Sequence, residues 1–192
     1  MKSKSYLIKL TVSAVMLALA FGLSYVRIFK LPYDGSVTLF SMLPIVIVSV
    51  KFGLAWGLGT AFCYSWLQIL QGHVFSWGLT PAMLVGSLFL DYIIAFTIIG
   101  LAGIFRKKGI PGIIWGTALA CILRFISHFT AGVVLWANYK EFVAFGQSWV
   151  GHPVLYSLVY NGAYMLPETI LTIVGIVLLT KLPQIEKIMR PE

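Results

Sequence analysis

The chain has 192 residues, of which 59% are hydrophobic and only 10% are charged. Soluble domains carry about 25% charged residues, so this composition excludes an ordinary water-soluble protein and indicates an integral membrane protein. The net charge of +8 does not indicate a nucleic-acid partner, because the basic residues stand at the ends of apolar segments and form no single patch.

The first expected helix spans residues 6–29, and Lys2, Lys4 and Lys9 precede its apolar run. Residues 18–20 have the A-x-A form of a signal-peptidase site, but the apolar run continues beyond them. We therefore expect an uncleaved first transmembrane helix. Ala14 and Ala18 lie four residues apart on it, and small residues at this spacing let another helix approach closely. They predict either a partner contact or packing inside the bundle.

Five further apolar segments follow at residues 37–50, 53–70, 82–105, 113–137 and 153–182. A transmembrane helix needs about 20 residues, so the second segment is short. Pro44 predicts a kink in it, and Pro167 predicts a kink in the last. The connections expected are a turn at 30–36, an uncharged loop at 71–81 and a polar loop at 138–152, which we expect to hold a short amphipathic piece. The predicted fold is an all-α, six-transmembrane-helix bundle that forms a single domain over residues 1–192.

Six helices place both chain ends on one side of the membrane. With this topology, ten basic residues fall on the side of the termini and three on the other. The ten are Lys2, Lys4, Lys9, Lys51, Arg106, Lys107, Lys108, Lys181, Lys187 and Arg190, and the three are Arg27, Lys30 and Lys140. By the positive-inside rule we expect cytoplasmic termini in the cell membrane, with the loops at 30–37, 71–81 and 138–152 facing outward.

The fifth segment carries ionisable residues inside an apolar span. Arg124, His128, Gly132 and Trp136 recur every four residues and so share one face of a helix. A charged side chain in hydrocarbon costs about 2.5 to 3.5 kcal/mol even on the lenient insertion scale. This face should therefore point to the protein interior, a cavity or a partner.

Polar and aromatic residues of other segments fall at a similar depth in the outward half. They are Asp91 and Tyr92 in the fourth segment, and Tyr156 and Asn161 in the sixth. Together with His128 and Trp136 they predict one outward-facing pocket. A carboxylate among aromatic faces suits a small, flat cation, since a desolvated cation–π contact is worth about 2 kcal/mol.

Structural interpretations of the same residues stay open. Asp91 could pair with Arg124 to hold helices together, and Trp136 and Tyr156 could be interfacial belt residues. Asn161 could join helices through hydrogen bonds. We expect Glu168, which lies deeper, to make a structural pairing, and His73 to be a loop residue and not a ligand contact.

Catalytic and metal motifs are not found. The sequence has no G-x-S-x-G nucleophile, H-E-x-x-H motif or phosphate-binding G-x-x-x-x-G-K-[ST] loop. Cys63 and Cys121 both fall in predicted spans and are expected to be buried free thiols, neither disulfide-bonded nor metal-binding. We expect no enzyme, no cofactor and no metal site.

Several stretches, taken together, carry a family resemblance. They are DGSVTL at 34–39, SMLPI at 41–45, LDY at 90–92, AF at 95–96, GLAG at 100–103, Arg124, SHF at 127–129, AG at 131–132, Trp136, YSL at 156–158 and YNG at 160–162. On these residues the chain resembles the ThiT family, the thiamine-specific S components of energy-coupling-factor (ECF) vitamin transporters.

The resemblance implies a six-helix S-component fold that binds thiamine from outside for ATP-driven uptake. It also implies a transmembrane coupling subunit of the EcfT type and two cytoplasmic ATPase subunits as partners. Asp91 takes the place of the family acid that meets the thiazolium, where some members have Glu. Tyr92, Arg124, His128, Trp136, Tyr156 and Asn161 fall on other ligand positions, with Lys in place of Arg124 in some members. Ala14 and Ala18 match the small-residue contact with the coupling subunit.

Some members close the pocket with a Trp in the first outer loop, where this chain has YDGS at 33–36. The alternatives are an S component for another vitamin or a thiamine precursor, and a membrane-embedded enzyme that uses Asp91 and His128 as acid and base.

Overall fold

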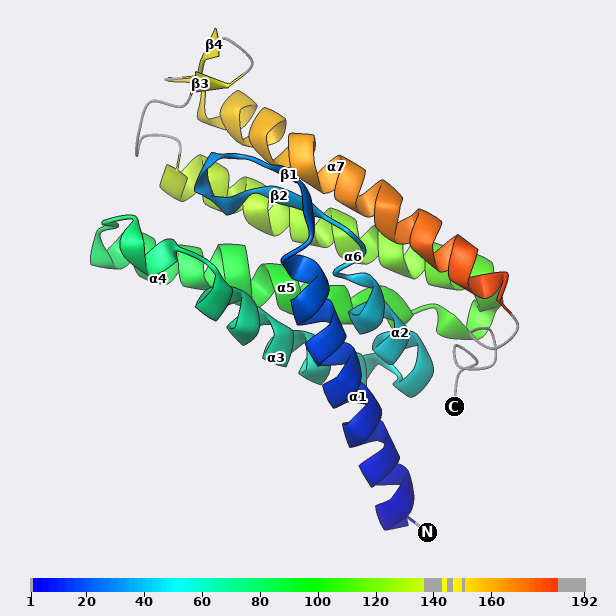
Figure 1. The fold of residues 1–192 in the computed structure, drawn as a ribbon. Helices are drawn as coiled ribbons and strands as arrows, with labels where there is room; N and C mark the ends of the chain where they lie inside the picture. Colours follow the sequence, from blue (N-terminus) through cyan, green and yellow to red (C-terminus); the bar gives the residue numbers. More distant parts are fainter. Residues whose placement is uncertain (1, 137–142, 145–146, 150, 183–192) are drawn as a thin grey trace.

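The structure is a computed structural model that describes residues 2–136, 143–144, 147–149 and 151–182. It is a bundle of helices with the β-hairpin of residues 27–38 lying along it and a second, shorter antiparallel pair of strands at one end (Figure 1). The α-helices are α1 Lys2–Ser24, α2 Leu43–Phe52, α3 Leu54–Gln71, α4 Pro81–Ser87, α5 Ala95–Thr97, α6 Gly109–Ala131 and α7 Pro153–Thr180. The strands are β1 Arg27–Lys30, β2 Ser36–Thr38, β3 Val143–Ala144 and β4 Gln147–Ser148.

The first predicted helix was too long at its C-terminal end. Helix α1 ends at Ser24, and β1 then pairs antiparallel with β2, in the register Phe29↔Val37 and Lys30↔Ser36. The apolar residues at 26–29 continue the hydrophobic run of α1, so hydropathy could not separate strand from helix. Tyr33 and Asp34, both at positive φ, form the turn between the strands. The expected turn at 30–36 is therefore the tip of a β-hairpin.

The second predicted helix began too early, and the predicted kink at Pro44 was wrong. Helix α2 starts at Leu43, so Pro44 lies in its first turn. Proline fits there because the first-turn N–H groups have no partner within the helix in any case. All residues from Leu43 to Val50 are buried, which makes this short helix the centre of the core.

The fourth and fifth predicted helices were placed correctly but are not uniform α-helices. Helix α4 continues into a π-helix at Leu88–Ile94, then α5, then a 3₁₀-helix at Ile98–Gly103. Helix α6 likewise continues into a π-helix at Gly132–Trp136. Such wide turns are rare and are frequently found at functional sites. Both π-helices here contain residues that the sequence had singled out.

Within the described residues, three apolar helical segments are long enough to cross a membrane: Lys4–Ser24, Pro81–Trp136 and Pro153–Thr180. The 56 residues of Pro81–Trp136 are interrupted by the 3₁₀-helix Arg106–Lys108 and by Gly109 at φ 70°. The chain is thus an all-helical membrane protein with several apolar helices. The count of six spans and the side of the termini remain predictions, and most of the predicted loop 138–152 lies outside the described residues.

One of the two cysteines was misplaced by the sequence. Cys121 is buried as expected, but Cys63 is exposed on α3. It belongs to the outer side of this helix, which also exposes Phe62 and Trp66. An apolar span does not reveal which of its faces meets lipid when it has no charged residue to mark the interior.

Three helical segments approach one another closely around Ser49 of α2. Its hydroxyl donates to the carbonyl oxygen of Gly100 at 2.6 Å and accepts from the N–H of Gly103 at 2.9 Å. Helix α3 places Gly57 on the same serine, where an added Cβ would lie 2.5 Å from the Cβ of Ser49. Glycine is needed at 57 for close packing.

We expect Gly57→Ala to lower stability by about 1 to 3 kcal/mol, the usual cost of overpacking a core. Gly59→Ala is the matched control on the same helix, because nothing lies within 4 Å of an added Cβ there. It should be neutral or stabilise by up to about 1 kcal/mol through helix propensity. Thermal unfolding of both variants in detergent measures the difference, and equal shifts would contradict this packing.

Candidate functional site

One pocket collects residues from the hairpin, α3, the π-helix after α4, α6 and α7. All seven residues that the sequence singled out as ligand contacts line it: Asp91, Tyr92, Arg124, His128, Trp136, Tyr156 and Asn161. They converge because their helices place them toward the same end of the bundle. Their role toward a ligand stays a prediction.

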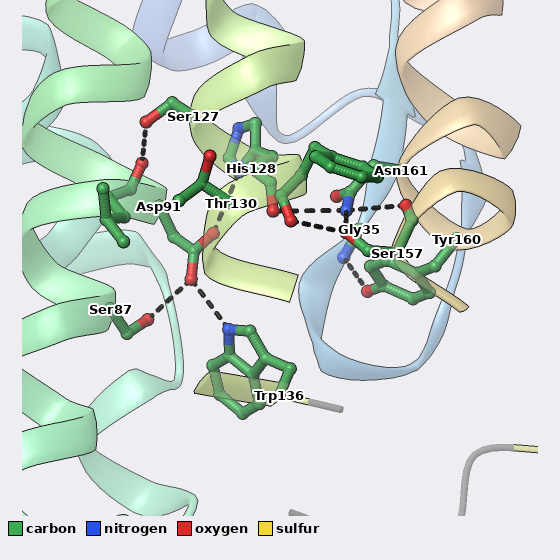
Figure 2. A network of polar contacts seen from close by, with 12 residues as sticks. Gly35, Ser87, Asp91, Ser127, His128, Thr130, Trp136, Ser157, Tyr160 and Asn161 are labelled. Atoms are coloured by element: carbon green, nitrogen blue, oxygen red, sulfur yellow. Dashed lines mark hydrogen bonds and ion pairs between the residues drawn. The ribbon is translucent and has the colours of Figure 1, made fainter. Parts of the chain in front are cut away.

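Asp91 is the centre of the polar network in the pocket (Figure 2). Its carboxylate accepts from the Ser87 hydroxyl at 3.0 Å and from the Trp136 indole N–H at 2.9 Å. The Nδ1 atom of His128 lies 3.1 Å from its second oxygen. Asp91 therefore pairs with His128 and not with Arg124, which corrects the structural alternative raised from the sequence.

His128 presents a free ring nitrogen to the pocket. A carboxylate only accepts hydrogen bonds, so the proton of the imidazole lies on Nδ1, facing Asp91. The other nitrogen, Nε2, is buried and has no hydrogen-bond partner among the described residues. A buried polar atom without a partner is costly, and a ligand in the pocket would satisfy it.

Arg124 lies deep in the pocket without a carboxylate within salt-bridge distance in the described part of the chain. Its Nη1 is 2.9 Å from the sulfur of Met42, and its guanidinium carbon is 4.4 Å from the centre of the Phe96 ring. Its Nε atom is buried and unpartnered. The guanidinium is thus held by a sulfur atom and an aromatic ring, so some of its N–H groups remain available to a ligand in the pocket.

Helix α7 supplies a row of tyrosines at four-residue spacing. Tyr156 and Tyr160 stack with ring centres 5.8 Å apart, and Tyr164 meets Tyr160 edge-on at the same distance. Asn161 lies in this row, but both ends of its amide already have protein partners, including the His128 carbonyl oxygen at 3.3 Å and the Tyr164 hydroxyl at 2.9 Å. The helix-joining role considered for Asn161 is therefore present.

The space that lets α7 approach α6 comes from Gly132. A Cβ at this position would collide with the Ser157 side chain and come within 3.2 Å of the Asn161 amide nitrogen. The Ser157 hydroxyl uses this closeness to donate to the Phe129 carbonyl oxygen at 2.7 Å. The glycine of the predicted stripe thus serves helix packing beside the pocket.

The β1–β2 hairpin forms part of the wall of the pocket. Tyr33 at its tip meets Trp77 and Trp136, with ring centres 6.1 and 6.0 Å apart, and the two tryptophans lie 5.4 Å from each other. The Tyr160 hydroxyl holds the hairpin from α7, since it donates to the Pro32 carbonyl oxygen and accepts from the Gly35 N–H at 3.1 Å. Aromatic rings from three segments therefore close the pocket.

Two acidic residues tie the hairpin to its neighbours. Glu168 of α7 is buried and accepts from both the backbone N–H and the hydroxyl of Thr38, each at 2.6 Å. At the other end Asp34 lies 2.9 Å from the Nδ1 atom of His73 and 3.2 Å from the Nζ atom of Lys30. The structural pairing expected for Glu168 is present, and His73 is more than a plain loop residue.

Sequence reasoning missed part of this pocket. Asp34 also lines it, although the sequence analysis did not name this carboxylate. Tyr33, Trp77, Tyr160 and Tyr164 were not singled out as contacts, although the tyrosine repeat of four was visible in the sequence. Two glutamines of α3, Gln68 and Gln71, also line the pocket, and no sequence pattern distinguished them.

Comparison with known proteins places the chain in a family. The family described as "Thiamine transporter protein (Thia_YuaJ)" matches residues 10–187. The chain belongs to this thiamine transporter family. Its members are the ThiT proteins, S components of ECF transporters, and a transporter family replaces the membrane-embedded enzyme that the sequence had left open.

Two curated relatives and one solved structure support the match. The chain is 30% identical to "Thiamine transporter ThiT" of Bacillus subtilis (strain 168), over 93% of each chain. It is also 30% identical to the protein of the same name from Lacticaseibacillus paracasei, over 96% of this chain and 93% of that one. A ThiT structure from Listeria monocytogenes has the same fold, with a TM-score of 0.73 at 23% identity, and covers 98% of this chain.

The Asp34 contacts predict how the hairpin responds to acid. Burial raises the pKa of Asp34, but hydrogen bonds from His73 and Lys30 outweigh it and leave the pKa below the usual value of 3.8. A carboxylate with a lowered pKa stabilises the folded form fully above its ordinary pKa. This stabilisation is lost as pH falls through the lowered value. We expect amide exchange in residues 27–38, corrected for its intrinsic rate, to quicken about two- to five-fold in that acid range.

The control for this prediction is Asp34→Asn, since asparagine tolerates the φ of 66° at this position. It loses the charge that attracts Lys30 and Arg27. Its hairpin should exchange faster at neutral pH already and show little further change on acidification. An acid step of equal size in the variant would assign the response to another group.

Proposed function

We propose that this protein is the substrate-binding subunit of an ECF transporter and that its pocket captures thiamine. One observation carries the proposal. Of the five buried side-chain polar atoms without a partner among the described residues, four belong to residues that line this one pocket. They belong to Gln68, Gln71, Arg124 and His128. Native structures leave few such atoms unsatisfied, so their gathering in one cavity indicates a missing polar ligand.

The chemistry of the pocket fits a flat cation with polar edges. Thiamine carries a permanent positive charge on its thiazolium ring, which no change of pH removes. A cation in a dry pocket needs an anion or aromatic faces in place of water. Asp91 offers the anion, and the indole of Trp136, oriented by its hydrogen bond to Asp91, offers the face. Tyr92, Tyr156 and Asn161 complete the proposed set of contacts with Arg124 and His128.

We propose that the pocket opens to the outside of the cell membrane. The support is the ten-to-three distribution of basic residues, which favours cytoplasmic termini for a chain of six spans. Under this topology the hairpin, the 72–80 loop and the start of α7 lie outward. In Figure 1 the hairpin, the start of α4 and the start of α7 lie toward the same end of the bundle.

We propose further that α1 carries the contact with an EcfT-type coupling subunit, which two cytoplasmic ATPases would drive. Ala14 and Ala18 are exposed, so they do not serve the internal packing that the sequence left as an alternative. Val15 and Leu19 beside them are 60% and 49% exposed. Figure 1 shows the N-terminal part of α1 extending away from the rest of the bundle. A small-residue groove flanked by apolar side chains suits a partner helix in the bilayer.

The charge at Asp91 gives the direct test of the pocket. Asp91→Asn keeps the shape and removes the charge, and a hydrogen bond to a charged group is worth about 1.5 to 3 kcal/mol. We expect thiamine affinity to fall roughly 10- to 150-fold, measured by calorimetry on purified protein. A neutral analogue with a pyridine in place of the thiazolium should lose much less.

Trp136→Phe is the companion variant, because it keeps an aromatic face but loses the N–H that binds Asp91. It should lose less than Trp136→Ala. An equal loss for the cationic and the neutral ligand in Asp91→Asn would mean that Asp91 supports the fold and does not sense charge. Mass spectrometry of ligand released from purified protein separates thiamine from another vitamin or a thiamine precursor.

The α1 contact predicts a split between binding and transport. Ala18→Trp places a large ring on the exposed face and should leave thiamine affinity within about two-fold of wild type, since this face lies outside the pocket. Uptake by cells that express the whole transporter should fall at least roughly ten-fold, because the ring blocks close helix approach. Ile122→Trp, at an exposed site of α6 and so away from this face, is the control. Lost binding with intact assembly would overturn this assignment.

A further inference from the structure

Helix α3 contributes a row of side chains to the pocket that neither the mechanism proposed above nor the fold explains. Tyr64, Gln68 and Gln71 are spaced by four and three residues, so they share one face of the helix, and all three line the pocket. The opposite face exposes Phe62, Trp66 and Leu70. The two glutamines are thus turned inward, away from the apolar side of the helix.

Both carboxamides keep unused hydrogen-bonding capacity. The Nε2 atoms of Gln68 and Gln71 are buried and have no partner among the described residues. An amide taken from water without a compensating hydrogen bond costs roughly 2 to 7 kcal/mol, depending on the reference. Packing alone would therefore favour leucine or methionine at these positions. A buried carboxamide that carries this cost is expected where it hydrogen-bonds another polar group.

Gln71 makes one side-chain hydrogen bond among the described residues, and this bond still leaves part of its amide without a partner. The Ser24 hydroxyl lies 2.8 Å from Gln71 Oε1 and also 2.6 Å from the Phe21 carbonyl oxygen. A hydroxyl has a single proton, so if it donates to Phe21 the amide of Gln71 would turn and donate to Ser24 instead. In either orientation one end of the Gln71 amide stays unpartnered beside the pocket. In the orientation of the structure this end is the N–H group, which binds an acceptor of the ligand. After the turn it would be the carbonyl oxygen, which binds a donor instead.

We infer that Gln68 and Gln71 form an amide subsite on α3 that hydrogen-bonds an uncharged acceptor of the bound ligand and so determines specificity. This inference rests on the function proposed above. The cationic ring is assigned to Asp91 and Trp136, so the amides take a neutral polar part. In thiamine such acceptors are the ring nitrogens of the aminopyrimidine and the oxygen of the hydroxyethyl group. Both offer the lone pair that an amide N–H needs.

The test replaces each glutamine by methionine, which has nearly the same shape and no amide. Gln68→Met and Gln71→Met are compared with Leu70→Met, a control on the exposed face of the same helix. Calorimetry uses thiamine, a dideaza analogue in which both pyrimidine ring nitrogens become C–H, and an analogue without the hydroxyl oxygen. We expect each glutamine variant to bind thiamine about 5- to 30-fold more weakly, as for a lost hydrogen bond in a desolvated site.

The analogues identify the acceptor. The analogue that lacks it should bind wild type more weakly, and its affinity should hardly change on Gln→Met, so the two losses are not additive. Additive losses with both analogues, or unchanged thiamine affinity in both variants, would overturn the subsite. If a methionine variant does not fold, the corresponding Gln→Leu variant replaces it, and both analogues are also measured on wild type. The same outcomes then support or overturn the subsite. A wild-type protein that binds no thiamine would instead overturn the proposed function, whatever the glutamine variants do.

Discussion

A polar group inside a bilayer has no water to bind, so each must find its partner within the protein. This constraint explains most of what the pocket looks like. Asp91 is surrounded by three donors from two helical segments, and Glu168 takes two hydrogen bonds from a single threonine of the hairpin. Serines and threonines elsewhere return their hydroxyls to nearby carbonyls, as Thr117 and Thr172 do. Among the described residues, four of the five buried side-chain polar atoms that lack a partner belong to residues around one cavity.

The same constraint joins recognition to closure. Trp136 binds the carboxylate of Asp91 and also contacts Tyr33 at the tip of the hairpin. Tyr160 contributes its ring to the stack on α7 and its hydroxyl to the hairpin backbone. The groups that would meet a ligand are therefore also the groups that hold the cover in place. A ligand that moves the Trp136 ring would act on the hairpin directly.

The sequence predicted the helices from apolar length, and the convergence of six of the seven residues from their depth in the membrane. Arg124 was added by the family resemblance. The sequence could not predict the hairpin, since Val26, Ile28 and Phe29 extend the apolar run of the helix before them on both sides of Arg27. The sequence analysis placed the start of the second helix a few residues too early. This difference decides whether Pro44 lies inside the helix and kinks it or lies in its first turn. Gln68 and Gln71 carry no charge and match no motif, so only their orphaned atoms reveal them.

The π-helix around Asp91 also bears on how this chain can vary. A π-turn holds an extra residue relative to an α-turn, and such a bulge is what a single inserted residue leaves when the rest of a helix keeps its contacts. Removing one residue between Leu88 and Ile94 would restore α-helical winding and leave the two flanks in their present register. The glycines at 100 and 103 would keep their contact with Ser49, but the side chains within the turn would change direction. Asp91 lies within this turn, so the extra residue is what aims its carboxylate at Ser87, His128 and Trp136.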